Sequence, residues 1–172
     1  AIFIIAVAGL IFIEPYRLNR IKTFLDPSVD PRGISYQLNQ SLIAIGSGGL
    51  FGNGYNESTQ KWGFLPEVVN DSIFAIVSEE LGFTGAMVLI GLFIFMAHTL
   101  ISIAKNTSDK FGCLLAIGMS TWIVGQAFIN IAAISGLVPL TGIPLPFVSH
   151  GGTALMALMA GLGIVSNIAR KI

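Results

Sequence analysis

The longest stretch without Asp, Glu, Lys or Arg covers residues 111–169 and is 59 residues long. A bilayer-spanning helix needs about 20 mainly apolar residues, so this stretch is long enough for two spans and a turn. A second uncharged stretch, 81–104, has 24 residues and room for one more span. Only 10% of the chain is charged, against about 25% in soluble domains. The sequence therefore predicts an integral membrane protein.

Three prolines divide the longer stretch within 136–147 (GLVPLTGIPLPF), because a continuous helix does not tolerate them. We therefore expect transmembrane helices at 81–104, 112–135 and 149–168, in an all-α polytopic bundle. The apolar residues 1–13 cover only about 20 Å as a helix and lack the basic flank and cleavage site of a signal peptide. We interpret them as the end of a longer transmembrane helix, which makes the chain a fragment of one membrane domain.

The order of these helices puts 105–111 and the C-terminus on one side of the membrane, and 14–80 and 136–148 on the other. The positive-inside rule assigns the first side to the cytoplasm, because it carries Lys105, Lys110, Arg170 and Lys171. Residues 14–80 then form a long extracytoplasmic loop. The formal net charge of zero provides no strong field to attract nucleic acid.

Two segments of the long loop have a distinctive composition. Residues 36–45 (YQLNQSLIAI) suit a short interfacial helix or, equally, a helix packed against the bundle. Residues 46–54 (GSGGLFGNG) contain five glycines, but their spacing fits neither the dinucleotide nor the P-loop pattern. We favour a tight turn over a phosphate cradle.

Carboxylates gather where the loop approaches the membrane. Pro66 suits the first position of a helix, which would place Glu67 and Asp71 four residues apart on one face. A carboxylate at the membrane boundary is costly unless it is paired or used. For Asp71, helix capping and a catalytic or ion-binding role are both open. Glu79 and Glu80 are expected to mark the start of the 81–104 helix.

Polar residues are few within the predicted spans. Gln126 and Asn130 are four apart, so they share one face of their helix, and we expect them to bond across the bundle interior. The single Cys113 excludes a disulfide framework. No combination of residues resembles a metal site or a nucleophilic triad.

Four blocks in chain order carry a resemblance to a known family. They are RLNRIKTFLDPSVDPRGISYQLNQSLIAIGSGGLFGNG, STQKWGFLPEVVNDSIFAIVSEELGF, GLVPLTGIPLPFVSHGG and GIVSNIAR. Together they resemble the SEDS family of FtsW, RodA and SpoVE, and this implies the C-terminal part of a roughly ten-helix fold. The 58–61 and TGIPLPF elements look more like the FtsW branch. Asn70 and Ser72 flank the aspartate where the family has Thr and Phe, and His150 stands where Tyr is usual.

The resemblance implies a peptidoglycan glycosyltransferase that polymerises lipid II at the outer face of the bacterial cytoplasmic membrane, in cell division at the septum. It implies Asp71 as the catalytic carboxylate, with Glu67 as a second catalytic candidate. This chemistry needs a base near the acceptor hydroxyl and positive charge near the pyrophosphate. The candidate substrate-binding residues are Arg17, Arg20, Lys22, Arg32, Gln40, Ser41, Lys61, Ser149, His150 and Gly151.

The resemblance defines no cofactor and no metal ligands, and a divalent cation is the one candidate to consider. The implied partners are a class B penicillin-binding protein, which is a transpeptidase, and other divisome proteins. Three alternatives stay open: a lipid II flippase, an elongation-type polymerase of the RodA kind, and a non-catalytic divisome scaffold. Polymer formed from purified lipid II would contradict the flippase, and a silent Asp71 substitution would favour the scaffold.

Overall fold

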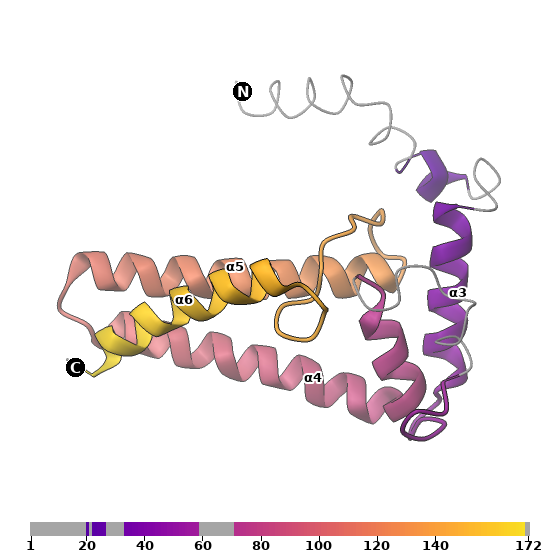
Figure 1. The fold of residues 1–172 in the computed structure, drawn as a ribbon, viewed down its shortest axis with the longest axis horizontal. Helices are drawn as coiled ribbons and strands as arrows, with labels where there is room; N and C mark the ends of the chain where they lie inside the picture. The colour runs from indigo at the N-terminus through magenta and orange to yellow at the C-terminus, as the bar shows by residue number, and fades with distance from the viewer. Residues whose placement is uncertain (1–19, 21, 27–32, 59–70, 171–172) are drawn as a thin grey trace.

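The computed structural model describes residues 20, 22–26, 33–58 and 71–170. Its helices are α3 (Ile34–Ser47), α4 (Ile73–Asn106), α5 (Lys110–Ile134) and α6 (Gly152–Ala169). The residues in these ranges include no strand. In Figure 1, α4, α5 and α6 run lengthwise beside one another, and α3 crosses one end of them. The predicted all-α bundle is confirmed.

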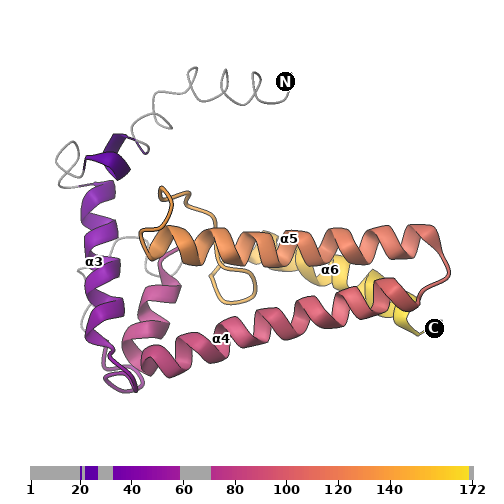
Figure 2. The ribbon, with the colours of Figure 1, turned by 180° about the vertical axis from the view of Figure 1, so that it is seen from behind.

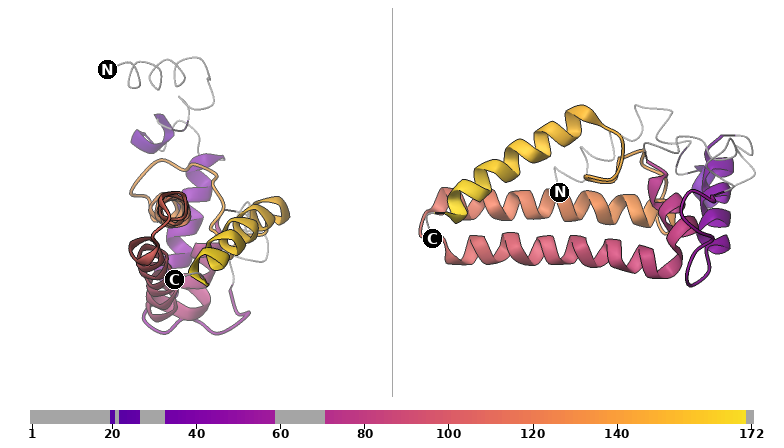
Figure 3. Two further views of the ribbon diagram at one scale, coloured as in Figure 1. Left: turned by 90° about the vertical axis from the view of Figure 1, so that its left-hand side faces the viewer. Right: turned by 60° about the horizontal axis from the view of Figure 1, so that its bottom comes forward.

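Three helices are long and apolar enough to cross a membrane in the described part of the chain: α4, α5 and α6. α4 and α5 form an antiparallel pair, and α6 converges on them towards its C-terminal end (Figure 3). α6 approaches α5 at Gly161, where a methyl group would lie 2.6 Å from Sδ of the flexible Met119 side chain.

The helix boundaries differ from the predicted ones. α4 begins at Ile73 and not at 81, but the non-helical Gly82 interrupts it, so the segment after the interruption begins close to the predicted position. α5 begins two residues early, because the Asp109 carboxylate accepts the N–H of Gly112 at 2.9 Å and caps the helix. α6 begins at Gly152, after the turn that contains Ser149. The expected helix end at 1–13 falls outside the described residues.

The two ends of the bundle carry different segments. The α4–α5 connection and the C-terminus lie at one end, whereas α3 and the proline-rich loop, residues 136–151, lie at the other (Figures 1 and 2). This arrangement agrees with the predicted helix order. It also places α3 and the first turns of α4 together in what was predicted to be the long loop. The cytoplasmic assignment of the first end stays a prediction.

α4 is broken near its start. Gly82 has φ 67° and ψ −165°, a non-helical conformation inside the helix, and the chain turns sharply there (Figure 2). A break leaves carbonyls on one side and N–H groups on the other without their helical partners. The N–H groups of Asn53 and Gly54 donate to the carbonyls of Glu79 and Glu80, at 3.0 and 3.2 Å.

The same glycine-rich loop, residues 46–54, serves the other side of the break. The N–H groups of Phe83 and Thr84 donate to the carbonyls of Gly49 and Leu50, at 2.9 and 3.1 Å. The loop therefore restores four backbone hydrogen bonds at the break. Because N–H groups of the loop are used in this way, the structure favours the tight turn over the phosphate cradle.

The glycines allow the loop backbone to lie directly on the helix backbone. A methyl group on Gly48 would lie 1.9 Å from the Ser78 carbonyl oxygen, and one on Gly52 would lie 2.1 Å from the Glu80 carbonyl oxygen. Gly52 also has φ 82°, in the left-handed region. No side chain fits at these positions, so the contact between the loop and the broken helix requires glycine at both.

We predict that Gly52→Ala destabilises the protein by at least about 2 kcal/mol, through strain at positive φ and the contact with Glu80. Gly46→Ala is the matched control, because a methyl group there meets nothing within 4 Å and alanine favours helix. The thermal unfolding midpoints of the two purified variants in detergent provide the measurement. Equal midpoints would contradict the role assigned to the loop.

Candidate functional site

Two side chains of opposite charge, Arg20 and Asp71, lie beside Gly142 of the proline-rich loop. A methyl group on Gly142 would lie 3.2 Å from Arg20 Nη2 and 3.7 Å from Asp71 Oδ2. The loop turns there with φ 70°, and the absence of a side chain on Gly142 leaves room for the guanidinium and the carboxylate beside it. Arg20 Nη1 donates to the Leu140 carbonyl at 2.7 Å, so the loop also holds the guanidinium in place.

Asp71 lies in the turn before α4 and not in a helix. The residue at the N-cap position of α4 is Ser72, and α4 has no side-chain cap. The structure therefore does not support helix capping as the role of Asp71. Glu67, expected on the same helix face, lies outside the described residues.

The Asp71 turn is held from two sides by amide side chains. Gln37 of α3 donates through Nε2 to Ser72 Oγ at 3.1 Å. Asn130 of α5 donates through Nδ2 to the Asp71 carbonyl at 2.9 Å and to the Ile143 carbonyl at 2.7 Å. The carboxylate is thus carried by a short turn that α3 holds through the Ser72 side chain and α5 holds through the Asp71 backbone, and Asn130 links the same turn to the proline-rich loop.

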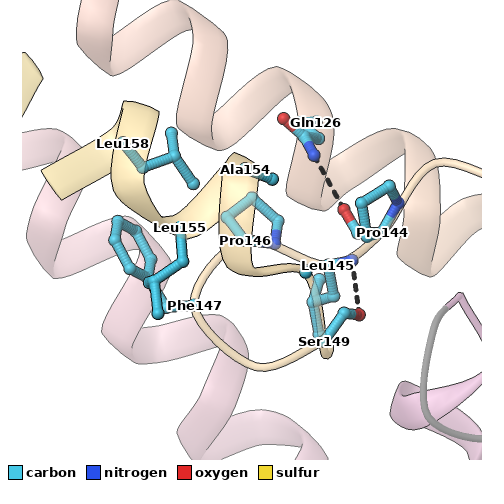
Figure 4. A pocket seen from close by; sticks show the side chains of 10 residues that line it. Gln126, Pro144, Leu145, Pro146, Phe147, Ser149, Ala154, Leu155 and Leu158 are labelled. Carbon is cyan, nitrogen blue, oxygen red and sulfur yellow. Dashed lines mark hydrogen bonds between the residues drawn. The ribbon is translucent and has the colours of Figure 1, made fainter. Parts of the chain in front are cut away.

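Gln126 holds the other part of the proline-rich loop. Its Nε2 donates to the Pro144 carbonyl at 2.8 Å, and the Leu145 N–H donates to Ser149 Oγ at 2.8 Å (Figure 4). Gln126 and Asn130 do bond inside the bundle, as expected, but their partners are loop carbonyls. The cavity drawn in Figure 4 has a volume of about 10 Å³, room for one water molecule. It is too small for a substrate.

The other predicted substrate-binding residues are not brought to Asp71 by any contact described for them. Ser41 is fully buried and donates to the Gln37 carbonyl within α3, so its hydroxyl is used inside the protein. Ser149 stabilises the loop turn, and Gly151 borders the small cavity. Of the remaining candidates, Lys22 and His150 are exposed, and Gln40 is half-buried. Arg17, Arg32 and Lys61 fall outside the described residues.

A second buried carboxylate lies at the break in α4. Glu79 is 0% exposed, and Ser58, 1% exposed, donates its hydroxyl to Glu79 Oε2. Glu79 lies just before the break at Gly82, close to the start of the helix predicted at 81–104, but its carboxylate is inside the protein and has a hydrogen-bond partner. A buried carboxylate in a membrane helix needs such a partner.

Some of the residues that build the site escaped the sequence interpretation. Gln37 stood out only as one amide in an apolar segment, and Gly142 as one glycine between prolines. Within the described ranges, no three His, Cys, Asp or Glu side chains come together to hold a metal ion.

The sequence of the whole chain matches one protein family. A family model described as "Cell cycle protein", that of FtsW, RodA and SpoVE, matches residues 1–172. The chain belongs to the FtsW/RodA/SpoVE family. With this membership and its three membrane-capable helices, it is an integral membrane protein.

Curated relatives from several bacteria are similar to this chain. Stage V sporulation protein E of Bacillus subtilis is 44% identical over 162 residues, which cover 94% of this chain and 44% of that protein. "Probable peptidoglycan glycosyltransferase FtsW" of Trichlorobacter lovleyi is 43% identical, covering 94% of this chain and 42% of that protein. The chain therefore spans less than half the length of these family members.

A solved structure shares the fold. It is described as "Structural coordination of polymerization and crosslinking by a peptidoglycan synthase complex" and matches with a TM-score of 0.74 at 26% identity. The match covers 99% of this chain and 48% of the other. The arrangement of α3 across the end of the spans is thus a fold already seen in a peptidoglycan synthase complex.

Proposed function

We propose that this chain forms the catalytic part of a peptidoglycan glycosyltransferase that polymerises lipid II at the outer face of the cytoplasmic membrane. One observation carries the proposal: Asp71 and Arg20 both lie beside Gly142, at the end of the bundle predicted to face outwards. FtsW relatives named as glycosyltransferases support it. The orientation follows from the positive-inside rule.

In the proposed reaction the 4-hydroxyl of the acceptor sugar attacks the anomeric carbon of a donor linked to a lipid pyrophosphate. The new glycosidic C–O bond forms as the bond from that carbon to the pyrophosphate oxygen breaks, and undecaprenyl pyrophosphate leaves. The hydroxyl proton passes to the Asp71 carboxylate, which acts as general base. Arg20 stabilises the negative charge that develops on the leaving oxygen.

The surroundings of the two groups suit these roles. A general base must stay in one position relative to the hydroxyl it deprotonates, and the Asp71 turn is tied to α3 and α5. A guanidinium fixed by the Leu140 carbonyl needs little rearrangement as charge develops. The proposed partner is a class B penicillin-binding protein, since polymerization and crosslinking are coordinated in the complex that shares this fold.

One prediction of this proposal concerns the charge of Asp71. Asp71→Asn keeps the shape but removes the base, so polymerisation should fall by roughly 10² to 10⁴. Glycan polymer is measured from lipid II with the full-length protein purified with its transpeptidase partner.

Asp109→Asn is the matched control, because the same chemical change falls on a capping residue at the opposite end of the bundle. Asparagine caps about as well as aspartate, so this variant should keep its activity. Polymerisation by Asp71→Asn at the wild-type rate would defeat the catalytic assignment. The polymer formed would still contradict the flippase, and another residue would have to act as the base.

A second prediction tests the space between the two charged groups. Gly142→Ala places a methyl group against Arg20 and near Asp71, and should lower polymerisation by about 10-fold or more, as displaced catalytic groups do. Gly136→Ala is the control: Gly136 has φ 72°, but a methyl group there meets only ordinary contacts at 3.7 Å and beyond. Both variants carry similar backbone strain, so equal activity per folded molecule would contradict the proposed site.

The proposed cellular role is division, on the resemblance of residues 58–61 and TGIPLPF to the FtsW branch. A fluorescently tagged full-length protein should gather at midcell in growing cells. Its depletion should produce filaments, because septal synthesis stops while elongation continues. Patches along the side wall, together with loss of cell shape on depletion, would instead indicate the RodA type.

A further inference from the structure

We propose that Asn130 is a positioning residue for Asp71, an inference that rests on the proposed catalytic role of that carboxylate. Asn130 lies near the outward end of α5 and is 1% exposed. A side chain buried to this extent does not reach a substrate. It acts through the backbone that it holds.

The amide nitrogen of Asn130 has two hydrogens and two acceptors. It donates to the Asp71 carbonyl at 2.9 Å and to the Ile143 carbonyl at 2.7 Å, so its donor capacity is fully used. One acceptor belongs to the residue that carries the carboxylate. The other directly follows Gly142, beside which Arg20 lies.

Asn130 therefore fixes the two backbone segments that face each other across the site. The carbonyl of Asp71 and its carboxylate are on one residue, so a shift of that backbone moves the base by a similar distance. A misplacement of about 1 Å is enough to cost about 10²-fold in rate. Neither an aspartate nor a leucine at this position supplies two donors, since ionised aspartate only accepts.

Gln126 provides a matched control on the same helix, one turn away. It also donates an amide hydrogen bond to a carbonyl of the proline-rich loop, that of Pro144 at 2.8 Å (Figure 4). Its bond does not involve Asp71. A general need for amides that hold the loop would make both residues equally important, whereas a need to position Asp71 would single out Asn130.

The test is a double-mutant cycle on lipid II polymerisation by the full-length protein with its transpeptidase partner. Asn130→Leu and Gln126→Leu are each made in the wild-type and in the Asp71→Asn protein. We expect Asn130→Leu to lower kcat by about 10- to 10²-fold with little change in KM, and Gln126→Leu to lower kcat much less. In the Asp71→Asn protein, Asn130→Leu should cost less than about 2-fold, because residues that act as one unit are not additive.

Unfolding midpoints and co-purification with the partner report on folding, and Asn130→Ala serves as a second variant without added apolar bulk. An equal loss from Asn130→Leu in both backgrounds would overturn the inference, because a merely structural role does not depend on the Asp71 charge. A similar kcat loss from Gln126→Leu would also overturn it. If Asp71→Asn is inactive and Asn130→Leu is silent, the inference alone fails. If Asp71→Asn is fully active, the proposed catalytic role of Asp71 fails together with it.

Discussion

Backbone N–H and C=O groups that are buried away from water must find partners within the protein, because neither its interior nor the bilayer core supplies any. This constraint governs the outward end of the bundle. The broken α4 obtains its partners from the backbone of the glycine-rich loop. The proline-rich loop, which cannot form a helix of its own, obtains them from Gln126, Asn130 and Arg20.

The site is a by-product of this arrangement. Arg20 and Asn130 each bond to a carbonyl of the proline-rich loop, and Asn130 adds the carbonyl of Asp71. The loop backbone thus serves as the common support on which a cation and a carboxylate are brought together. The polar side chains inside the spans, Gln126 and Asn130, are used for this support.

Much of the architecture could be predicted from the distribution of charge. Uncharged stretches and prolines located all three membrane-capable helices, because burying a charge in lipid is costly. The helical turns of α4 before Gly82 were missed, and so was the burial of Glu79 against Ser58, which the one-dimensional pattern does not reveal. The spacing of Gln126 and Asn130 predicted a shared inward face, but their acceptors are distant in sequence. The resemblance indicated Asp71. The role of Gly142 depends on its lack of a side chain, and no sequence pattern predicted it.

The break at Gly82 has a consequence for the height of the site above the membrane. α4 has 34 residues, which as one straight helix would be longer than the roughly 30 Å hydrocarbon core requires. The part after Gly82 suffices for the crossing, so the first turns bend aside and lie next to α3 (Figure 1). A lipid-linked sugar is held at a fixed height by its own anchor in the bilayer. The position of Gly82 along α4 thus sets the length of the part that crosses the membrane. Moving the break by one residue would change that length by about 1.5 Å.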